Sequence, residues 1–174
     1  RIARDGIELL GFQGGYIEIP ATISFNPRAY LQADLYHKVP YWVYGRGNVV
    51  VPKIQEMEDQ LERYVDRRFN YECDFNEFSD YDFSSKEIKS DVAILNEGVS
   101  VKLKSKIDVG IKENVFSISD YIGVDVPIDL KTLYDMAVDV VNRELRRSEI
   151  GNAPFEAATM DLIAAYAKDK NSVL

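Results

Sequence analysis

The sequence has very few of the residues that usually carry catalysis or cross-links. Its 174 residues include one histidine, one tryptophan and one cysteine. Any Ser-His-Asp or Cys-His device would therefore have to use His37. This residue lies beside a lysine in LYHKVPYW, and no nucleophile motif surrounds it. We interpret His37 as a surface or interface histidine, and the sequence offers no catalytic constellation.

Long apolar runs and an excess of positive charge are also missing. No apolar run comes near the length of about 18 residues that a membrane-spanning helix needs, and no signal peptide is present. The 21 basic residues against 29 acidic ones give a net charge of −8. This charge argues against a nucleic-acid partner, which requires a basic footprint. The sequence begins on Arg1 within a helical pattern, which predicts that residues 1–174 are a single domain cut from a longer protein.

The single cysteine, Cys73, has three interpretations. It is a free thiol, or one half of a disulfide whose partner lies outside this chain, or a redox nucleophile. The third is disfavoured because no histidine or basic cluster lies nearby in the sequence to activate the thiol. The residues themselves leave the first two open.

The stretch from Ser90 to Ile111 organises the chain. Its apolar residues occupy odd positions and its lysines even ones, which is how the two faces of a strand alternate. The link Asn96-Glu97-Gly98 contains residues that accept a positive φ. We therefore predict a β-hairpin over 90–111 with one apolar and one basic face, followed by extended segments at 115–118 and 121–126. The apolar residues are Val99, Val101, Leu103, Ile107, Val109 and Ile111, and the lysines are Lys102, Lys104 and Lys106.

Four segments carry the periodicity of amphipathic helices. They are residues 1–10, 52–69, 129–147 and 155–167. Pro52 suits a first helical turn, and Asp129 suits the position just before one. A sheet with one apolar face needs cover from such helices. We predict an α+β fold, with an antiparallel sheet of about four or five strands and about three or four helices packed mainly on one face.

The segments between these elements are less regular. Gly11 is expected to end the first helix, and residues 16–20 and 39–44 are predicted as strands. Residues 21–38 have little periodicity and predict a loop. The densest aromatic cluster falls here and is a candidate interface, since aromatic residues are enriched in interfaces, although such residues are as often core in an edge strand. Its members are Tyr36, Tyr41, Trp42 and Tyr44.

One group of acidic and amide side chains has the composition of a cation site. Carboxylates and an amide at close spacing are what Ca²⁺ requires. The spacing does not match the EF-hand loop and the glycine of that loop is missing, so a solvated acidic loop is the favoured interpretation. We assign no metal, cofactor or catalytic residue. The group consists of Asp74, Asn76, Asp80 and Asp82.

Two short stretches carry a resemblance to a known group of proteins. GIELLGFQGGYIEIP ends a helix, and VPYWVYG precedes the helix PKIQEMEDQLERYVDRRF, which leads shortly to a cysteine. This arrangement resembles uncharacterised single-pass, membrane-anchored extracytoplasmic proteins of small-genome (DPANN-type) archaea with an LGLQGGYI-like motif. The specific part is Leu10–Pro20 and Pro40–Gly45, and Phe12 stands where an aliphatic residue is expected. The resemblance implies a membrane anchor before Arg1, an outward-facing α+β domain, and a disulfide from Cys73 to an upstream cysteine.

These observations favour one function over two others. The favoured function is a non-enzymatic, extracytoplasmic cell-surface domain that mediates contact, adhesion or assembly with other proteins. It would use protein partners or self-assembly, would be anchored to the membrane through a segment upstream of residue 1, and would need no cofactor. A carboxylate- or metal-dependent hydrolase acting through the 74–82 loop is the first alternative. A structural subunit of a filament or virion is the second.

Overall fold

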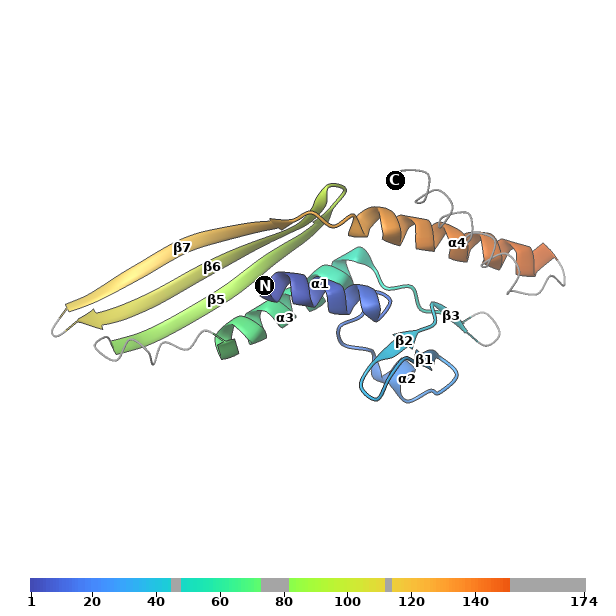
Figure 1. Ribbon diagram of the computed structural model, residues 1–174, viewed down its shortest axis with the longest axis horizontal. Helices are drawn as coiled ribbons and strands as arrows, with labels where there is room; N and C mark the ends of the chain where they lie inside the picture. The colour runs from blue at the N-terminus through green and yellow to red at the C-terminus, as the bar shows by residue number, and fades with distance from the viewer. Residues whose placement is uncertain (45–47, 73–81, 112–113, 151–174) are drawn as a thin grey trace.

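The computed structural model describes residues 1–44, 48–72, 82–111 and 114–150 (Figure 1). These residues form helices and antiparallel strands, which confirms the predicted α+β class. Cys73, three members of the acidic group (Asp74, Asn76 and Asp80) and the helix predicted over 155–167 lie outside the described residues. The elements in chain order are α1 (Ile2–Phe12), α2 (Ala21–Ser24), β1 (Tyr30–Gln32), β2 (Lys38–Pro40), β3 (Val43–Tyr44), β4 (Asn48–Val49), α3 (Ile54–Glu72), β5 (Asp82–Leu95), β6 (Gly98–Ile111), β7 (Asn114–Val126) and α4 (Leu130–Ile150).

The largest sheet places three long strands in the order β5-β6-β7. It contains the hairpin predicted over 90–111, with Leu95 opposite Gly98 at the turn. The first arm is longer than predicted because β5 already begins at Asp82. β7 runs without interruption from Asn114 to Val126 and so joins two extended segments that were predicted separately. The remaining strands pair in two small antiparallel sheets, β1-β2 and β3-β4.

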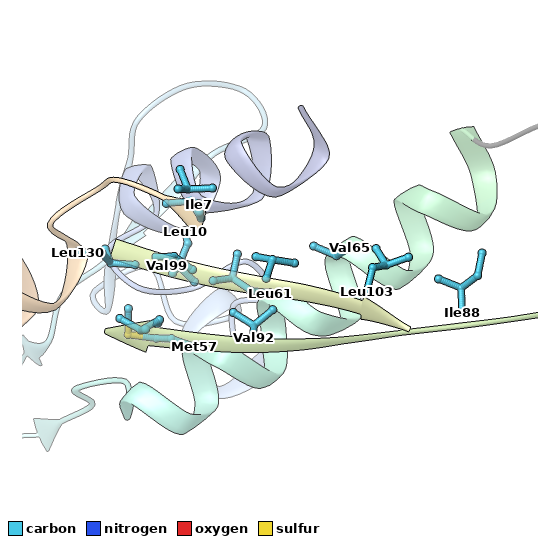
Figure 2. Close-up of a cluster of buried hydrophobic side chains, with 13 residues drawn as sticks. Ile7, Leu10, Met57, Leu61, Val65, Ile88, Val92, Val99, Leu103 and Leu130 are labelled. Carbon is cyan, nitrogen blue, oxygen red and sulfur yellow. The ribbon is translucent and has the colours of Figure 1, made fainter. Parts of the chain in front are cut away.

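Helices α1 and α3 cover one face of β5 and β6 and form the main core with them (Figure 2). Val99, Val101 and Leu103 of β6 are buried in this core, while Lys102 and Lys104, which alternate with them along the strand, are exposed. This is the alternation expected of a strand with one covered face. The helices contribute one apolar stripe each, because an α-helix returns to the same face about every 3.6 residues. The buried helical residues are Ile7, Leu10, Met57, Leu61 and Val65.

α1 ends in a turn that depends on a later glycine than the one predicted. The Gly15 N–H donates to the Leu10 carbonyl at 2.8 Å, and the Gly14 N–H donates to the Gly11 carbonyl at 3.2 Å. This pair of bonds is the Schellman motif, in which one residue takes the left-handed conformation. Gly14 is that residue, with φ of 62°. The prediction that Gly11 ends the helix is wrong, since Gly11 lies within α1.

The strand predicted over residues 16–20 is also wrong, because side chains rather than a neighbouring strand satisfy its backbone. The N–H groups of Ile17 and Glu18 both donate to Oε1 of Gln60 at 2.8 Å. Gln13 donates to the Tyr16 and Ile17 carbonyls. These bonds hold an irregular connection in place where a ladder of strand bonds was expected.

The region between α1 and α3 is a small second unit of short elements. It contains α2 and β1, although residues 21–38 were predicted as a loop. Elements of three or four residues are too short to produce a detectable period. The strand predicted over 39–44 is divided between β2 and β3. Tyr16, Ile23 and Ala29 form the buried centre of this unit.

α4 begins directly after Asp129, as predicted, and contacts the rest of the fold near its start. Leu130 joins the main core, and the Tyr134 hydroxyl donates to the Pro52 carbonyl at 2.9 Å. From there the helix extends away from the large sheet (Figure 1). Among the described helices, none combines the length and the apolar content that crossing a membrane requires.

A candidate interaction surface on β7

An apolar groove lies between the start of α1, the end of α3 and strands β6 and β7 of the large sheet. Its volume is about 410 Å³. Ile122 and Val124 of β7 form one wall, and each exposes about half of its surface, 52% and 50%. Arg1 and Glu72, which are joined by an ion pair of 2.9 Å, lie at the charged side. The other lining residues are Ile2, Ala3, Phe69, Val101 and Leu103.

The groove exists because the helices cover the sheet unevenly. α3 contacts β5 along much of its own length, whereas the extended contact of β7 with another described element is limited to β6. On the face that is buried on β6, Phe116 of β7 remains 54% exposed, much like Ile122 and Val124. Val126, at the end of the strand, is buried. The apolar face of the sheet therefore continues past its helical cover and onto β7.

At the opposite edge of the sheet, α3 binds the backbone of β5. Three acidic side chains, one per turn of the helix, accept hydrogen bonds from backbone N–H groups of β5. Glu58 accepts from Ile94 at 2.8 Å, and Glu62 accepts from Val92 at 3.1 Å. Asp66 accepts from the Ser90 N–H at 2.7 Å and from its hydroxyl at 2.8 Å. Over residues 90–94 the β5 edge is thus closed by α3, because its outward donors already have acceptors.

On the second face of the sheet, β6 carries the lysines that the sequence predicted, and Asp91 of β5 and Asp125 of β7 lie on the same face. Lys102, Lys104 and Lys106 are all exposed on β6. The ammonium group of Lys104 lies 5.8 Å from the ring centre of Tyr121, which stands opposite it on β7. Contacts of this kind at exposed sites contribute roughly 0.5–1 kcal/mol. The two faces of β7 therefore border different surfaces, one apolar and one that carries the lysines of β6.

The predicted aromatic interface does not form one surface. Tyr36 and Tyr41 are exposed, at 87% and 43%, and remain candidates for a contact. Trp42 and Tyr44 are partly buried. The Trp42 indole donates to the Gly14 carbonyl at 2.8 Å, and its ring packs against Tyr134. Tyr44 packs against the small second core. Trp42 and Tyr44 therefore pack within the fold, which was the second interpretation of the aromatic cluster.

His37 lies in a tight loop closed by Asp34. The Asp34 carboxylate accepts hydrogen bonds from the Tyr36 and His37 N–H groups at 2.8 Å. It also lies 2.7 Å from Nδ1 of His37. The bond from the Tyr36 backbone is the main cause that lowers the pKa of Asp34, followed by the His37 side chain. The histidine ring packs edge-on against Phe12. This arrangement is a loop closure of the kind that aspartate side chains often make.

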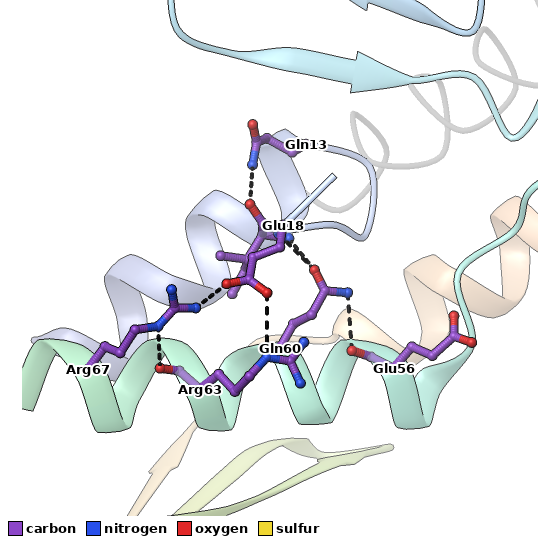
Figure 3. A network of polar contacts seen from close by, with 7 residues as sticks. Gln13, Glu18, Glu56, Gln60, Arg63 and Arg67 are labelled. Atoms are coloured by element: carbon purple, nitrogen blue, oxygen red, sulfur yellow. Dashed lines mark hydrogen bonds and ion pairs between the residues drawn. The ribbon is translucent and has the colours of Figure 1, made fainter. Parts of the chain in front are cut away.

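A polar network joins the 13–18 connection to α3 (Figure 3). Gln60 is buried and donates to the Glu56 carbonyl at 3.1 Å while it accepts from the connection. Glu18 forms ion pairs with Arg63 and Arg67, and the hydrogen bond from Arg67 is the main cause that lowers the pKa of Glu18. These hydrogen bonds and ion pairs hold the backbone of the connection against α3.

Other titratable side chains are engaged in a similar way. Burial raises the pKa of Tyr16 to about 12, and its hydroxyl donates to the Val50 carbonyl at 2.6 Å. Within residues 1–44, 48–72, 82–111 and 114–150, no three histidine, cysteine, aspartate or glutamate side chains are grouped as metal ligands would be. Of the predicted acidic group the structure describes Asp82 alone, at the start of β5.

The β7 wall of the groove was missed by sequence reasoning. Phe116, Ile122 and Val124 were predicted to be extended, but nothing in the sequence says which strands the helices cover. The available signal was the alternation in β7, in which most even positions are apolar, Asp120 excepted, and most odd positions are serine, tyrosine, glycine or aspartate. The strand therefore has a face to bury, and a partner for that face has to be found in the fold.

Comparison with known proteins yields no relative. The chain matches no protein-family model, and no curated protein or solved structure is significantly similar to it.

Proposed function

We propose that this chain is a non-enzymatic protein-interaction domain that mediates contact, adhesion or assembly through β7 and the adjoining apolar groove. The observation that carries the proposal is the half-exposed apolar wall of Ile122 and Val124. Isolated apolar residues on a surface are ordinary, but a groove lined mainly by apolar side chains is typical of a binding site.

We further propose that the domain acts outside the cytoplasm, at the cell surface, and is anchored to the membrane. Support comes from the resemblance carried by Leu10–Pro20 and Pro40–Gly45. In that compartment a disulfide from Cys73 to an upstream cysteine would persist. The hydrolase alternative would act through the 74–82 loop, and no observation on the described residues favours it.

The interaction is tested by site-specific photo-crosslinking in living cells of the source organism. A photoreactive phenylalanine analogue replaces Val124 in the full-length protein, and a second strain carries it at Thr132, an exposed position on α4. We expect an adduct of defined mass from position 124 and none from position 132. The further substitution Ile122→Asp should abolish the adduct, since it places a charge in the groove wall.

Location is tested on the same cells by protease treatment from outside. Cleavage of the domain in intact cells, together with recovery in the membrane fraction, is the expected result. A soluble protein that is protected from the protease would overturn the proposed location. Absence of an adduct at position 124, in cells that express the protein at its normal level, would overturn the proposed interaction.

A further inference from the structure

We propose that β7 pairs antiparallel with β7 of a second copy of this chain, so that the two sheets join into one. This inference rests on the proposed function and names the partner that occupies the same surface. It follows from the two edges of the sheet, from the backbone groups that β7 directs outward, and from the positions of its charges.

The two edges of the sheet differ in their readiness to accept a strand. Edge strands are commonly blocked by lysine, proline, bulges or a covering element. The β5 edge has three of these features: α3 closes residues 90–94, the register shifts between Phe83 and Ser85, and lysines stand at 86 and 89. β7 contains neither lysine nor proline, and its register with β6 runs without a shift over its whole length. Of the two edges, β7 is the one on which another strand can lie.

The hydrogen bonds of β5 identify which residues of β7 direct backbone groups outward. Ser90, Val92 and Ile94 donate to α3 and therefore face away from β6. In an antiparallel strand, the N–H and C=O groups of successive residues point alternately to its two neighbouring strands. The β6 residues opposite these three therefore direct their N–H and C=O groups to β7, where their partners are even-numbered residues. The odd-numbered residues of β7, such as Ser119 and Gly123, then direct their N–H and C=O groups to the open side.

A twofold axis at Tyr121 gives a symmetric pair in which no like charges face each other. A register centred on Tyr121 pairs residues 116–126 of the two copies and sets Asp125 opposite Ser117. No acidic residue then meets another. The pair is isologous, because each residue meets the same patch of the other copy.

The side chains that flank this register also suit a second copy. At each end of the contact, Phe116 of one copy would lie opposite Val126 of the other on the helix-covered face, so that apolar residues meet there. On the other face, the lysines of each copy lie on β6, one strand away from the contact, so no two lysines come directly opposite each other.

Two double variants of the full chain test the pairing and its register. In the register centred on Tyr121, Ser119 of one copy faces Gly123 of the other. Both residues are exposed, and a Cβ at Gly123 meets no atom within 4 Å. Within each chain Ser119 and Gly123 lie opposite lysines of β6, so acidic substitutions bring no like charges together in the monomer. The like-charge variant carries Ser119→Glu with Gly123→Glu, and the opposite-charge variant carries Ser119→Glu with Gly123→Lys. Thr132→Glu with Asn142→Glu adds two acidic residues at exposed positions of α4 as the control.

Sedimentation velocity over a wide concentration range measures the outcome, and thermal melting confirms that each variant is folded. We expect the wild type and the α4 control to approach twice the 19.8 kDa of one chain. The like-charge variant should raise the dissociation constant roughly tenfold or more, because two like-charged pairs form in each dimer. The opposite-charge variant should restore wild-type affinity.

Each contrary result overturns a defined part of the inference. A wild type that stays monomeric at every concentration overturns the second copy as the partner; an adduct with a different protein at position 124 would still support the proposed function. A dimer that the like-charge variant leaves intact overturns β7 as the contact. Failure of the opposite-charge variant to restore the dimer overturns the antiparallel register about Tyr121.

Discussion

Gly98 occupies a position in the β5–β6 turn where a side chain has no room. Its φ is 152°, and a Cβ built on it would lie 2.5 Å from the carbonyl oxygen of Val126. We expect Gly98→Ala to lower the free energy of unfolding by about 1–3 kcal/mol, because the backbone is strained and the Val126 carbonyl has to move. Urea denaturation measures the change.

Gly123 provides a matched control in the same sheet. A Cβ there meets no atom within 4 Å, so we expect Gly123→Ala to change the free energy of unfolding by less than about 0.5 kcal/mol or to stabilise slightly. Equal losses in the two variants would contradict the steric explanation. The sequence identified Gly98 as a turn residue, but its closeness to Val126 depends on β7, which lies far along the chain.

Glu18 makes stability depend on pH in a defined direction. Its pKa lies below the ordinary value of 4.5 in the folded state, mainly because Arg67 donates a hydrogen bond to it. The stabilisation is therefore complete above pH 4.5 and is lost as the pH falls through the lower folded-state pKa. Glu18→Gln should be less stable than the wild type at pH 7, and the difference should vanish at strongly acidic pH.

The control for this pH dependence is Glu8→Gln, which removes one exposed carboxylate from α1. Urea denaturation from pH 7 to strongly acidic pH measures both variants against the wild type. The pH-dependent difference should be larger for Glu18→Gln. If the Glu18→Gln difference instead grew as the pH fell, the assigned direction of its pKa would be wrong.

At the scale of elements, α3 closes the β5 edge through its acidic side chains. The Val92 N–H donates to the Glu62 carboxylate at 3.1 Å. A bond to a charged acceptor contributes about 1.5–3 kcal/mol, so Glu62→Leu should speed hydrogen exchange of the Val92 amide by roughly tenfold or more. Glu62→Gln keeps an acceptor oxygen and should show a smaller increase. Exchange followed by NMR measures both, and equal rates in the two variants would contradict this role of the Glu62 carboxylate.

The elements differ in how far the sequence predicts them. The 90–111 hairpin and α3 have long periodic patterns, and their existence follows from the residues alone. The strand over 16–20 was predicted wrongly because Gln60, more than forty positions away, accepts the hydrogen bonds of two of its backbone N–H groups. The groove could not be predicted, because alternation identifies the face of β7 but not the place where α1 and α3 end above it.

At the scale of the whole molecule, one core joins α1, α3, α4 and the large sheet. Leu61 is 1% exposed at its centre, and Leu61→Ala should cost about 2–5 kcal/mol. Trp42 is the single tryptophan and packs outside this core, against Tyr134. We expect Trp42 fluorescence and far-ultraviolet circular dichroism to report the same urea midpoint in the wild type and in Leu61→Ala. Separate midpoints would show that the small second unit unfolds on its own.

The unequal edges of the large sheet also set the number of partners that each molecule can accept. A chain with two open edges can bind a neighbour on each side, and such contacts repeat without limit into a fibre. Here α3 and the irregular start of β5 close one side of the sheet. If β7 pairs as proposed, addition through the sheet therefore ends with two molecules, because neither of them has a second open edge.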